Sequence, residues 1–238
     1  MGVQLPSPAP MSNELIVPEG TNLIINDTPY PDDSVRSLFD DLTPVAKVKW
    51  LILSATEMTR ELGAILTPAL LGATFLFPGE GSQYIKSRLN LEGYNIITSR
   101  RFIGNRPSSV EVQVPPPVIE AVENSPTPSV TIIDDVIATG ETVESIRREV
   151  EWDMRYPPRV LTWSVYCWLK QWSAKMPDIE VVSCIVYKRK SGRVPLNSLS
   201  TIMSTTNKGA IVRSSYAQRY FADPTEFIIA LKQLETYA

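Results

Sequence analysis

The chain has 238 residues, a hydrophobic fraction of 43% and a formal net charge of −3. This length suits one large domain, or one domain with an added subdomain, and it is long enough to bury a sizeable core. The slightly negative charge provides no basic field, so we do not expect nucleic acid as a partner.

Histidine is absent from the sequence, which removes several kinds of catalytic site. Ser-His-Asp and Cys-His units, zinc deaminase sites and HExxH sites all need histidine. Cys167 and Cys184 lie in separate apolar runs, and we expect both to be buried free thiols of a reducing compartment. No secretory signal or membrane span is expected, so the predicted location is the cytoplasm.

The first quarter of the chain is predicted to hold a tail and then helices. Residues 1–32 are rich in Pro and are expected to be a flexible segment. Residues 33–70 are predicted as N-terminal helices, because apolar residues recur every three or four positions up to about residue 66. Thr43 and Pro44 suit a helix cap and a first-turn pair.

A strand–loop–helix–strand unit is predicted next. Residues 73–77 form the first strand, "PGEGS" a glycine-bearing loop, residues 83–91 a helix that closes near Gly93, and residues 94–98 the second strand. "SVEVQV" alternates as an exposed strand does, and "PPPVIEAVENSPTPS" holds a brief helix.

Strands and helices keep alternating in the second half. We expect strands at 130–133, 160–168 and 181–187, a helix at 141–150 and a short polar helix between the last two strands. Residues 71–190 are therefore predicted to be an α/β core with a central, mostly parallel twisted sheet flanked by helices. Residues 191–238 are expected to be a small hood or tail that ends in a helix at "DPTEFIIALKQL".

The stretch "SVTIIDDVIATGETVESI" carries the chemistry. Asp134 and Asp135 follow an apolar run, and a turn with Thr139, Gly140 and Thr142 leads into a helix. The first amides of that helix, its dipole and the two threonine hydroxyls make a cradle for an anion. Gly140 lets the backbone approach the ligand closely.

Two carboxylates beside a phosphate site would repel the phosphate. At about 4 Å and an effective dielectric constant near 20, the repulsion is about 4 kcal/mol. A neutral, hydroxyl-rich group between them removes this conflict, and a ribose 5-phosphate fits that description. A magnesium ion near the acids would also bring in a pyrophosphate. Two other interpretations remain: a solvated turn with a helix cap, and a receiver domain, which lacks the Thr-Gly-x-Thr pattern.

"TIIDDVIATGET" resembles the signature of the type I phosphoribosyltransferases, which bind 5-phosphoribosyl 1-diphosphate (PRPP). The resemblance covers roughly residues 73–168. It implies that Asp134 and Asp135 contact the ribose hydroxyls, with magnesium held by these acids, in part through water. It implies that the 5-phosphate lies on Ala138, Thr139, Gly140, Glu141 and Thr142.

The same resemblance extends to the upstream strand–loop–helix unit. It implies that the pyrophosphate is bound by Gly79, Glu80, Gly81 and Ser82, with help from Arg100 and Arg101. Arg106 is the cation of the short segment after the second strand, where the family places a closing catalytic loop. Lys188 ends a strand and is a candidate for the nucleobase, although the pattern favours a plain charged turn.

The resemblance predicts an enzyme that transfers the phosphoribosyl group from PRPP to a nitrogen of a purine or pyrimidine base, with release of diphosphate. A homodimer is expected by similarity only. The short loop leaves a second hypothesis open, a non-catalytic PRPP- or nucleotide-binding regulatory protein, and a third, a domain that keeps the fold for assembly. The base would be chosen by residues 189–222 or by the N-terminal helices.

Overall fold

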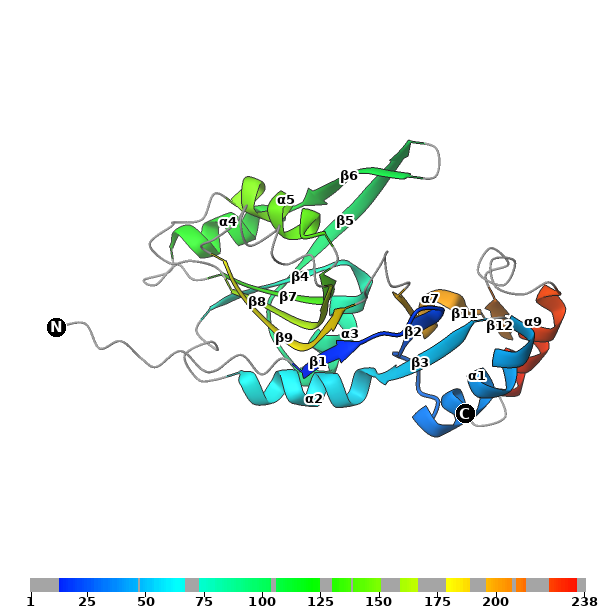
Figure 1. Cartoon of the computed structure of the whole chain (residues 1–238). Coiled ribbons are helices and arrows are strands. Elements are labelled where there is room, and N and C mark those ends of the chain that lie inside the picture. Colours follow the sequence, from blue (N-terminus) through cyan, green and yellow to red (C-terminus); the bar gives the residue numbers. More distant parts are fainter. Residues whose placement is uncertain are drawn as a thin grey trace. The chain divides into compact units, whose positions relative to one another are not determined.

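The computed structural model describes residues 13–46, 48–66, 73–103, 106–124, 130–137, 139–150, 159–166, 179–188, 196–206, 209–212 and 223–234. The chain divides into two compact units. The first comprises Met1–Leu15 and Met58–Tyr187, and the second comprises Ile16–Glu57 and Lys188–Ala238. Each unit is described by itself below, and Figure 1 labels their helices and strands.

The first unit is built on a seven-stranded sheet with the order β1-β9-β8-β7-β4-β5-β6. Neighbours from β9 through β5 pair in parallel, and β6 pairs with β5 in the antiparallel sense. This confirms the predicted α/β fold with a mostly parallel central sheet. The strands are β1 (Asn13–Ile16), β4 (Thr74–Pro78), β5 (Tyr94–Ile103), β6 (Arg106–Gln113), β7 (Val130–Ile137), β8 (Arg159–Tyr166) and β9 (Glu180–Lys188).

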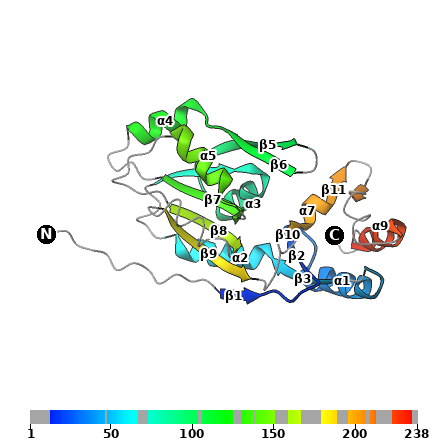
Figure 2. The same ribbon diagram turned by 45° about the horizontal axis from the view of Figure 1, so that its top comes forward.

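Helices cover both faces of this sheet (Figures 1 and 2). On one face, α4 (Pro116–Glu123) and α5 (Glu141–Val150) pack Val118, Val122, Val143 and Ile146 into an apolar cluster with Ile132 of β7. On the other lie α2 (Ala55–Ile65) and α3 (Gly79–Leu89). There the buried indole Nε1 of Trp163 donates to the Thr59 hydroxyl at 3.0 Å, and the rings of Trp163 and Tyr84 meet edge to face. Both faces of the sheet are thus buried, as expected of parallel strands.

Strand β7 extends four residues beyond its predicted end. We expected a strand at 130–133, but the backbone stays extended through Ile137 and pairs with β8 at Asp134, Val136 and Ile137. Two adjacent carboxylates suggested a strand end, whereas the pairing with β8 holds them inside the strand. Successive strand residues point to opposite faces, so the two acids diverge.

The second unit has its own parallel sheet, in the order β10-β2-β3. Its strands are β2 (Thr21–Asn26), β3 (Lys49–Ser54) and β10 (Leu196–Ser198). Helices α1 (Asp32–Ala46) and α9 (Pro224–Gln233) share a buried cluster with it, in which Phe39 contacts the rings of Trp50 and Phe227. The short helix α7 (Leu199–Ile202) and the hairpin of β11 (Met203–Thr206) and β12 (Gly209–Val212) complete it.

The predictions for the first 66 residues were wrong in two places. Strand β3 interrupts what looked like continuous helix from residue 33 to 66, because "KWLILS" pairs with β2 along its whole length. An apolar run of six residues fits either structure, and its partner strand decides between them. That partner, β2, lies within the segment predicted to be a flexible tail, as does β1.

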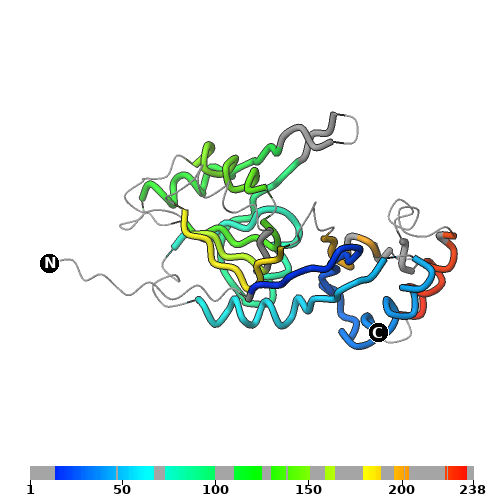
Figure 3. The backbone as a smooth tube through the Cα atoms, viewed as in Figure 1, coloured from blue at the N-terminus to red at the C-terminus, as the bar shows by residue number. Residues whose placement is uncertain are grey.

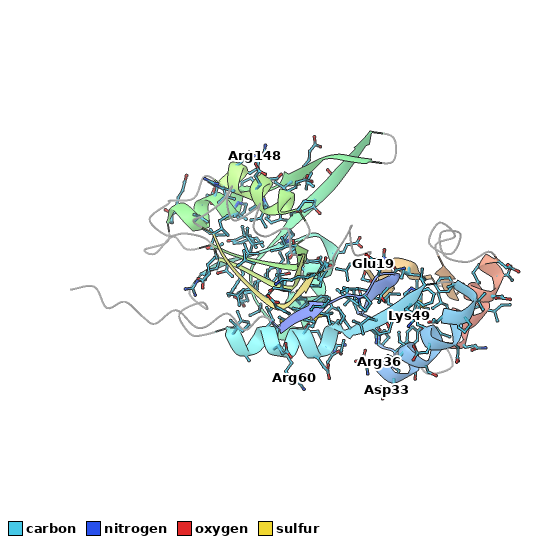
Figure 4. The ribbon with its side chains drawn as sticks, viewed as in Figure 1. Glu19, Asp33, Arg36, Lys49, Arg60 and Arg148 are labelled. Carbon is cyan, nitrogen blue, oxygen red and sulfur yellow. The ribbon has the colours of Figure 1, made fainter. Side chains whose placement is uncertain are left out.

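The predicted C-terminal helix is confirmed, whereas Thr43 and Pro44 do not begin a helix but lie inside α1. Helix α9 begins after Asp223, whose carboxylate accepts from the Thr225 amide at 2.9 Å and whose pKa is lowered by that hydrogen bond. Helix α1 carries Asp33 in its first turn, within 3.1 Å of Arg36 (Figure 4). The predicted helix between the last two strands lies outside the described residues. Among the described helices, none combines the length and the apolar character needed to cross a bilayer.

Candidate functional site

The strand order places a topological switch point between β4 and β7. From β4 the chain moves through α3 to β5 and β6 on one side, and from β7 it moves through α5 to β8 and β9 on the other (Figure 3). In open α/β sheets, ligands bind beyond the carboxyl ends of strands at such a point. The "PGEGS" segment begins at the last residue of β4 and the acid pair lies near the end of β7, so both lie at this edge of the sheet.

The predicted pyrophosphate loop is the first turn of helix α3. The helix begins at Gly79, not at residue 83, and ends at Leu89 before Asn90, which is left-handed at φ 50°. Gly79 has φ 71°, so the chain can turn directly from strand into helix there. The hydroxyl of the fully buried Ser82 donates to the Gly79 carbonyl at 3.0 Å. Ser82 therefore stabilises this turn and does not offer its hydroxyl to a ligand.

The two acids of the pair lie in different surroundings. Asp134 is 8% exposed, and its Oδ1 accepts from the amide of Asp135 at 2.9 Å. Asp135 is half-buried, and its Oδ1 accepts from the amide of Val136 at 2.8 Å. The hydroxyl of Thr162 on β8 donates to the carbonyl of Asp135 at 2.9 Å, which ties the backbone of β7 in place.

The carboxylate of Asp135 lies directly over Gly81 in the first turn of α3. A Cβ atom built on Gly81 would lie 2.8 Å from the Cβ of Asp135, and closer still to its carboxylate carbon and Oδ2. Real Cβ atoms essentially never come so close, so only glycine fits at position 81. The structure thus brings together two groups of predicted site residues that are separated by more than fifty positions in the sequence.

The turn after β7 leads through Gly140 into helix α5. Gly140 is buried with φ 76°, a conformation that favours glycine, and its carbonyl accepts from Glu144 to open helix α5. Thr139 is exposed, and its hydroxyl lies 3.4 Å from the amide of Glu141. Glu141 is exposed and Thr142 half-buried, while Ala138 lies outside the described residues.

The predicted basic residues are placed differently from what we expected. Arg100 and Arg101 do not follow the second strand but lie within β5, where they pair with Val110 and Ser109 of β6. Arg106 is the first residue of β6 and pairs with Ile103. The side chains of these three arginines are outside the described part of the structure.

Lys188 is the last residue of β9 and belongs to the second unit. Its carbonyl accepts from the amide of Val17 at 2.8 Å. A role for its side chain at a nucleobase stays a prediction.

The described residues do not form a complete metal cage. They contain no cluster of three or more Asp, Glu or Cys side chains able to hold a metal ion. Magnesium is commonly bound by only one or two carboxylates, with substrate phosphates and water filling its octahedron. The acid pair fits an ion that arrives with a phosphorylated ligand, and it does not fit a resident structural ion.

Two threonines that the sequence analysis did not single out lie beside the candidate site residues. Thr162 is fully buried within the apolar strand β8, and the Thr98 hydroxyl would lie 3.3 Å from a Cβ on Gly79. A polar residue in the middle of an apolar strand was the available signal for Thr162, because a buried hydroxyl needs a hydrogen-bond partner.

An open groove of about 690 Å³ lies beside the phosphate turn, between α5 and the hairpin of β5 and β6. Glu141, Arg148 and Glu149 of α5 line it together with Glu111 and Gln113 of β6, and Arg148 is labelled in Figure 4. Neither acid of the pair lines this groove. Among the described residues, Cys184 is a buried free thiol. Burial and, less strongly, the charge of Glu61 raise the pKa of this thiol to about 12. Cys167 lies outside the described residues.

Comparisons with known proteins give structural neighbours only. No protein-family model matches the sequence, and no curated protein matches it significantly. A purine phosphoribosyltransferase from Pyrococcus horikoshii is 16% identical over 60% of this chain and 86% of its own, with a TM-score of 0.37. An adenine phosphoribosyltransferase from Trypanosoma brucei, solved with AMP, pyrophosphate and ribose-5-phosphate, is 16% identical over 56% and 65%, with a TM-score of 0.39.

A protein from Aquifex aeolicus is 13% identical over 52% of this chain, with a TM-score of 0.37. The matched region spans 58% of that protein's length. Each of these likenesses concerns the fold alone.

Proposed function

We propose that this protein binds PRPP at the crevice between β4 and β7 and transfers its phosphoribosyl group to a nitrogen of a nucleobase. The observation that carries the proposal is the meeting of three elements at the switch point. These are the acid pair of β7, the glycine turn before α5, and the first turn of α3, against which Asp135 packs.

The ribose 5-phosphate is assigned to β7 and the turn that follows it. Asp134 and Asp135 accept hydrogen bonds from the ribose hydroxyls, and the backbone of residues 138–142 binds the 5-phosphate. The first amides of α5 have no partners within the helix, although that of Glu141 donates to the Thr139 hydroxyl at 3.4 Å. Phosphate oxygens would replace that hydroxyl as the acceptor and would take the amides that follow. Each hydrogen bond to a charged oxygen contributes about 1.5–3 kcal/mol, so a few of them hold a phosphate firmly.

The diphosphate is assigned to Gly79, Glu80, Gly81 and Ser82, with the amides of the first turn of α3 as donors. Because the hydroxyl of Ser82 bonds to the Gly79 carbonyl and its amide is the first in α3 with an acceptor inside the helix, Ser82 would shape this turn while the amides of Gly79, Glu80 and Gly81 act as donors. Arg100, Arg101 and Arg106 are proposed to add positive charge from the hairpin of β5 and β6. Magnesium that arrives with the diphosphate would be held by Asp134 and Asp135, in part through water, and it supplies positive charge to the leaving group.

The chemistry needs no histidine. The nitrogen lone pair of the base forms a bond to ribose C1 while the bond from C1 to the diphosphate oxygen breaks. The diphosphate leaves with the bonding electrons, and the proton on the attacking nitrogen is lost to solvent. Positive charge develops on the sugar and negative charge on the leaving group, so positioning and electrostatic stabilisation dominate the catalysis.

The paired hairpin favours a second candidate, a protein that binds PRPP or a nucleotide without turning it over. Strands β5 and β6 pair from Ile97 and Gln113 out to Ile103 and Arg106, so the segment after the second strand is a hairpin and not a long loop. A site that no loop closes lets water reach the reactive sugar. For both candidate functions we propose a homodimer in the cytoplasm. In both, residues 189–222 or the N-terminal helices would select the base.

Isothermal titration with PRPP and magnesium chloride, followed by a diphosphate-release assay with a panel of purine and pyrimidine bases, tests the proposal. Binding with release of diphosphate supports the transferase, and binding without release supports the regulatory protein. If neither Asp134→Asn nor Asp135→Asn alters PRPP binding, the site is misplaced. Glu120→Gln, an exposed acid on α4, is the matched control.

A further inference from the structure

The position of the Asp135 carboxylate has a consequence for the order in which a ligand can enter the crevice. One oxygen, Oδ1, is held by the amide of Val136, and the other, Oδ2, lies over Gly81 at the first turn of α3. This is the turn whose amides are assigned to the diphosphate. A carboxylate and a diphosphate are both anions, so they repel each other strongly at contact distance.

We propose that Asp135 covers the diphosphate position in the ligand-free protein and must turn away before diphosphate can bind. This inference rests on the proposed function, because it takes the first turn of α3 as the diphosphate site. The backbone of Asp135 stays fixed through its carbonyl, which accepts from Thr162, so only the side chain has to rotate. The turned carboxylate needs a new partner, and the ribose hydroxyls of PRPP provide one.

Asp135 therefore discriminates between two ligands that carry the same diphosphate group. PRPP supplies ribose hydroxyls that accommodate the displaced carboxylate, whereas free diphosphate leaves it without a partner and close to negative charge. Binding of PRPP is favoured over binding of free diphosphate, the leaving group of the reaction. Asp134 has no such role, because its carboxylate follows the opposite alternation of the strand and its Oδ1 accepts from the Asp135 amide.

Substitutions at Asp135 separate its charge from its shape. Asp135→Asn keeps the shape of the side chain, and its amide oxygen can still accept from Val136, but it removes the charge. Asp135→Ala removes both the charge and the oxygens that lie over Gly81. We expect both variants of the full chain to bind diphosphate, titrated without magnesium so that no metal ligand is lost, at least about tenfold more tightly than the wild type, which corresponds to about 1.4 kcal/mol. For PRPP we expect a smaller gain in affinity, or a loss of affinity.

The test is isothermal titration of sodium diphosphate in magnesium-free buffer, and separately of PRPP with magnesium chloride, into the wild type and each variant. Glu120→Gln, an exposed acid on α4, is the control and should bind diphosphate as the wild type does. Thermal melting checks that each variant is folded, and if Asp135→Ala is not, the isosteric Asp135→Asn decides. Unchanged or weaker diphosphate binding in the folded Asp135 variants, or no diphosphate binding by any of them, overturns the inference.

The same titrations separate this inference from the proposed function. If the wild type binds PRPP but the Asp135 variants gain nothing for diphosphate, the function stands and the covering role of Asp135 is wrong. If the wild type binds no PRPP and the Asp135 variants nevertheless gain diphosphate binding, Asp135 covers an anion site whose ligand is not PRPP.

Discussion

Replacing Gly81 by alanine tests the contact between α3 and β7 on which the site depends. The new Cβ would lie 2.8 Å from the Cβ of Asp135 and within the space of its carboxylate. Either α3 shifts or Asp135 leaves its place and loses the hydrogen bond from the Val136 amide. Overpacking of this kind costs about 1–3 kcal/mol, and a lost hydrogen bond to a charged oxygen costs about 1.5–3 kcal/mol where it is buried.

Alanine also has a benefit in a helix, which offsets part of that cost. It is favoured over glycine by up to about 1 kcal/mol in a helix interior, and by less in a first turn. We therefore expect Gly81→Ala to lower the free energy of unfolding by roughly 1–3 kcal/mol. For a chain of this size each kcal/mol lowers the melting temperature by about 2–4 °C.

Gly63→Ala in α2 is the matched control. Its Cβ would meet only Cδ2 of Leu89, at 2.8 Å, and this methyl group is the far end of a flexible side chain. Rotation of Leu89 relieves the overlap, so Gly63→Ala should be neutral or slightly stabilising. Urea denaturation followed by circular dichroism, with thermal melts beside it, compares the two variants under the same conditions.

A second background makes the test specific for Asp135. In an Asp135→Gly chain the side chain that opposes residue 81 is gone, so Gly81→Ala should no longer destabilise. If Gly81→Ala is as stable as Gly63→Ala in the otherwise wild-type chain, Asp135 does not lie over α3. The close approach of the two halves of the site would then be refuted.

Three further predictions concern other parts of the molecule. Gly140→Ala should destabilise the first unit by about 1–2 kcal/mol, because φ 76° is strained for any residue with a Cβ. The same substitution should weaken PRPP binding. Melting curves and PRPP titrations equal to those of the wild type would contradict this prediction. Asp223→Ala should destabilise α9 at neutral pH, because the Thr225 amide loses its acceptor. The Thr225 amide lowers the pKa of Asp223 in the folded protein. The difference in free energy of unfolding between wild type and variant should therefore be present above the unfolded pKa near 3.8 and should shrink as the pH falls through the lower folded pKa. Urea denaturation midpoints of both proteins at pH 3 and pH 7 measure this difference in stability. A larger difference at pH 3 than at pH 7 would contradict the prediction. In a Cys167→Ser chain, Cys184 should react with a thiol reagent at pH 8 only after unfolding in urea, because burial raises its pKa to about 12; rapid reaction of the native protein would show that the thiol is accessible.

The alternation of strands and helices predicted the fold class and much of the first unit. Helix α5 was predicted with its observed bounds, because a glycine turn precedes it and the apolar spacing of "ETVESIRREV" is helical. Helix α9 was predicted from its Asp-Pro start, which the structure confirms through the cap on Thr225. These features are local, so the sequence alone shows them.

The errors have a common physical origin in contacts between distant segments. Strand β3 looked helical because its partner β2 was hidden in a segment taken for a tail. Strand β7 was predicted too short because its pairing with β8 continues past the two acids. The arginines of β5 were expected in a loop, whereas an antiparallel partner extends that strand to Ile103.

The site residues were suggested by their motif, but the geometry between them was not. Nothing near Gly81 in the sequence indicates that a carboxylate from residue 135 lies against it, because register between β4 and β7 decides that contact. The signature and the pyrophosphate segment were each identified separately. The structure adds that Asp135 of the signature packs against Gly81 of the pyrophosphate segment.

The most direct measurement of the central claim is a calorimetric titration of PRPP, with magnesium chloride, into the wild type and Asp134→Asn, beside the control Glu120→Gln. We expect saturable binding by the wild type and the control, and binding at least about tenfold weaker in Asp134→Asn, since a charge-assisted hydrogen bond to the ribose would be lost. Equal affinities for all three proteins, or no heat of binding in the wild type, would contradict the account.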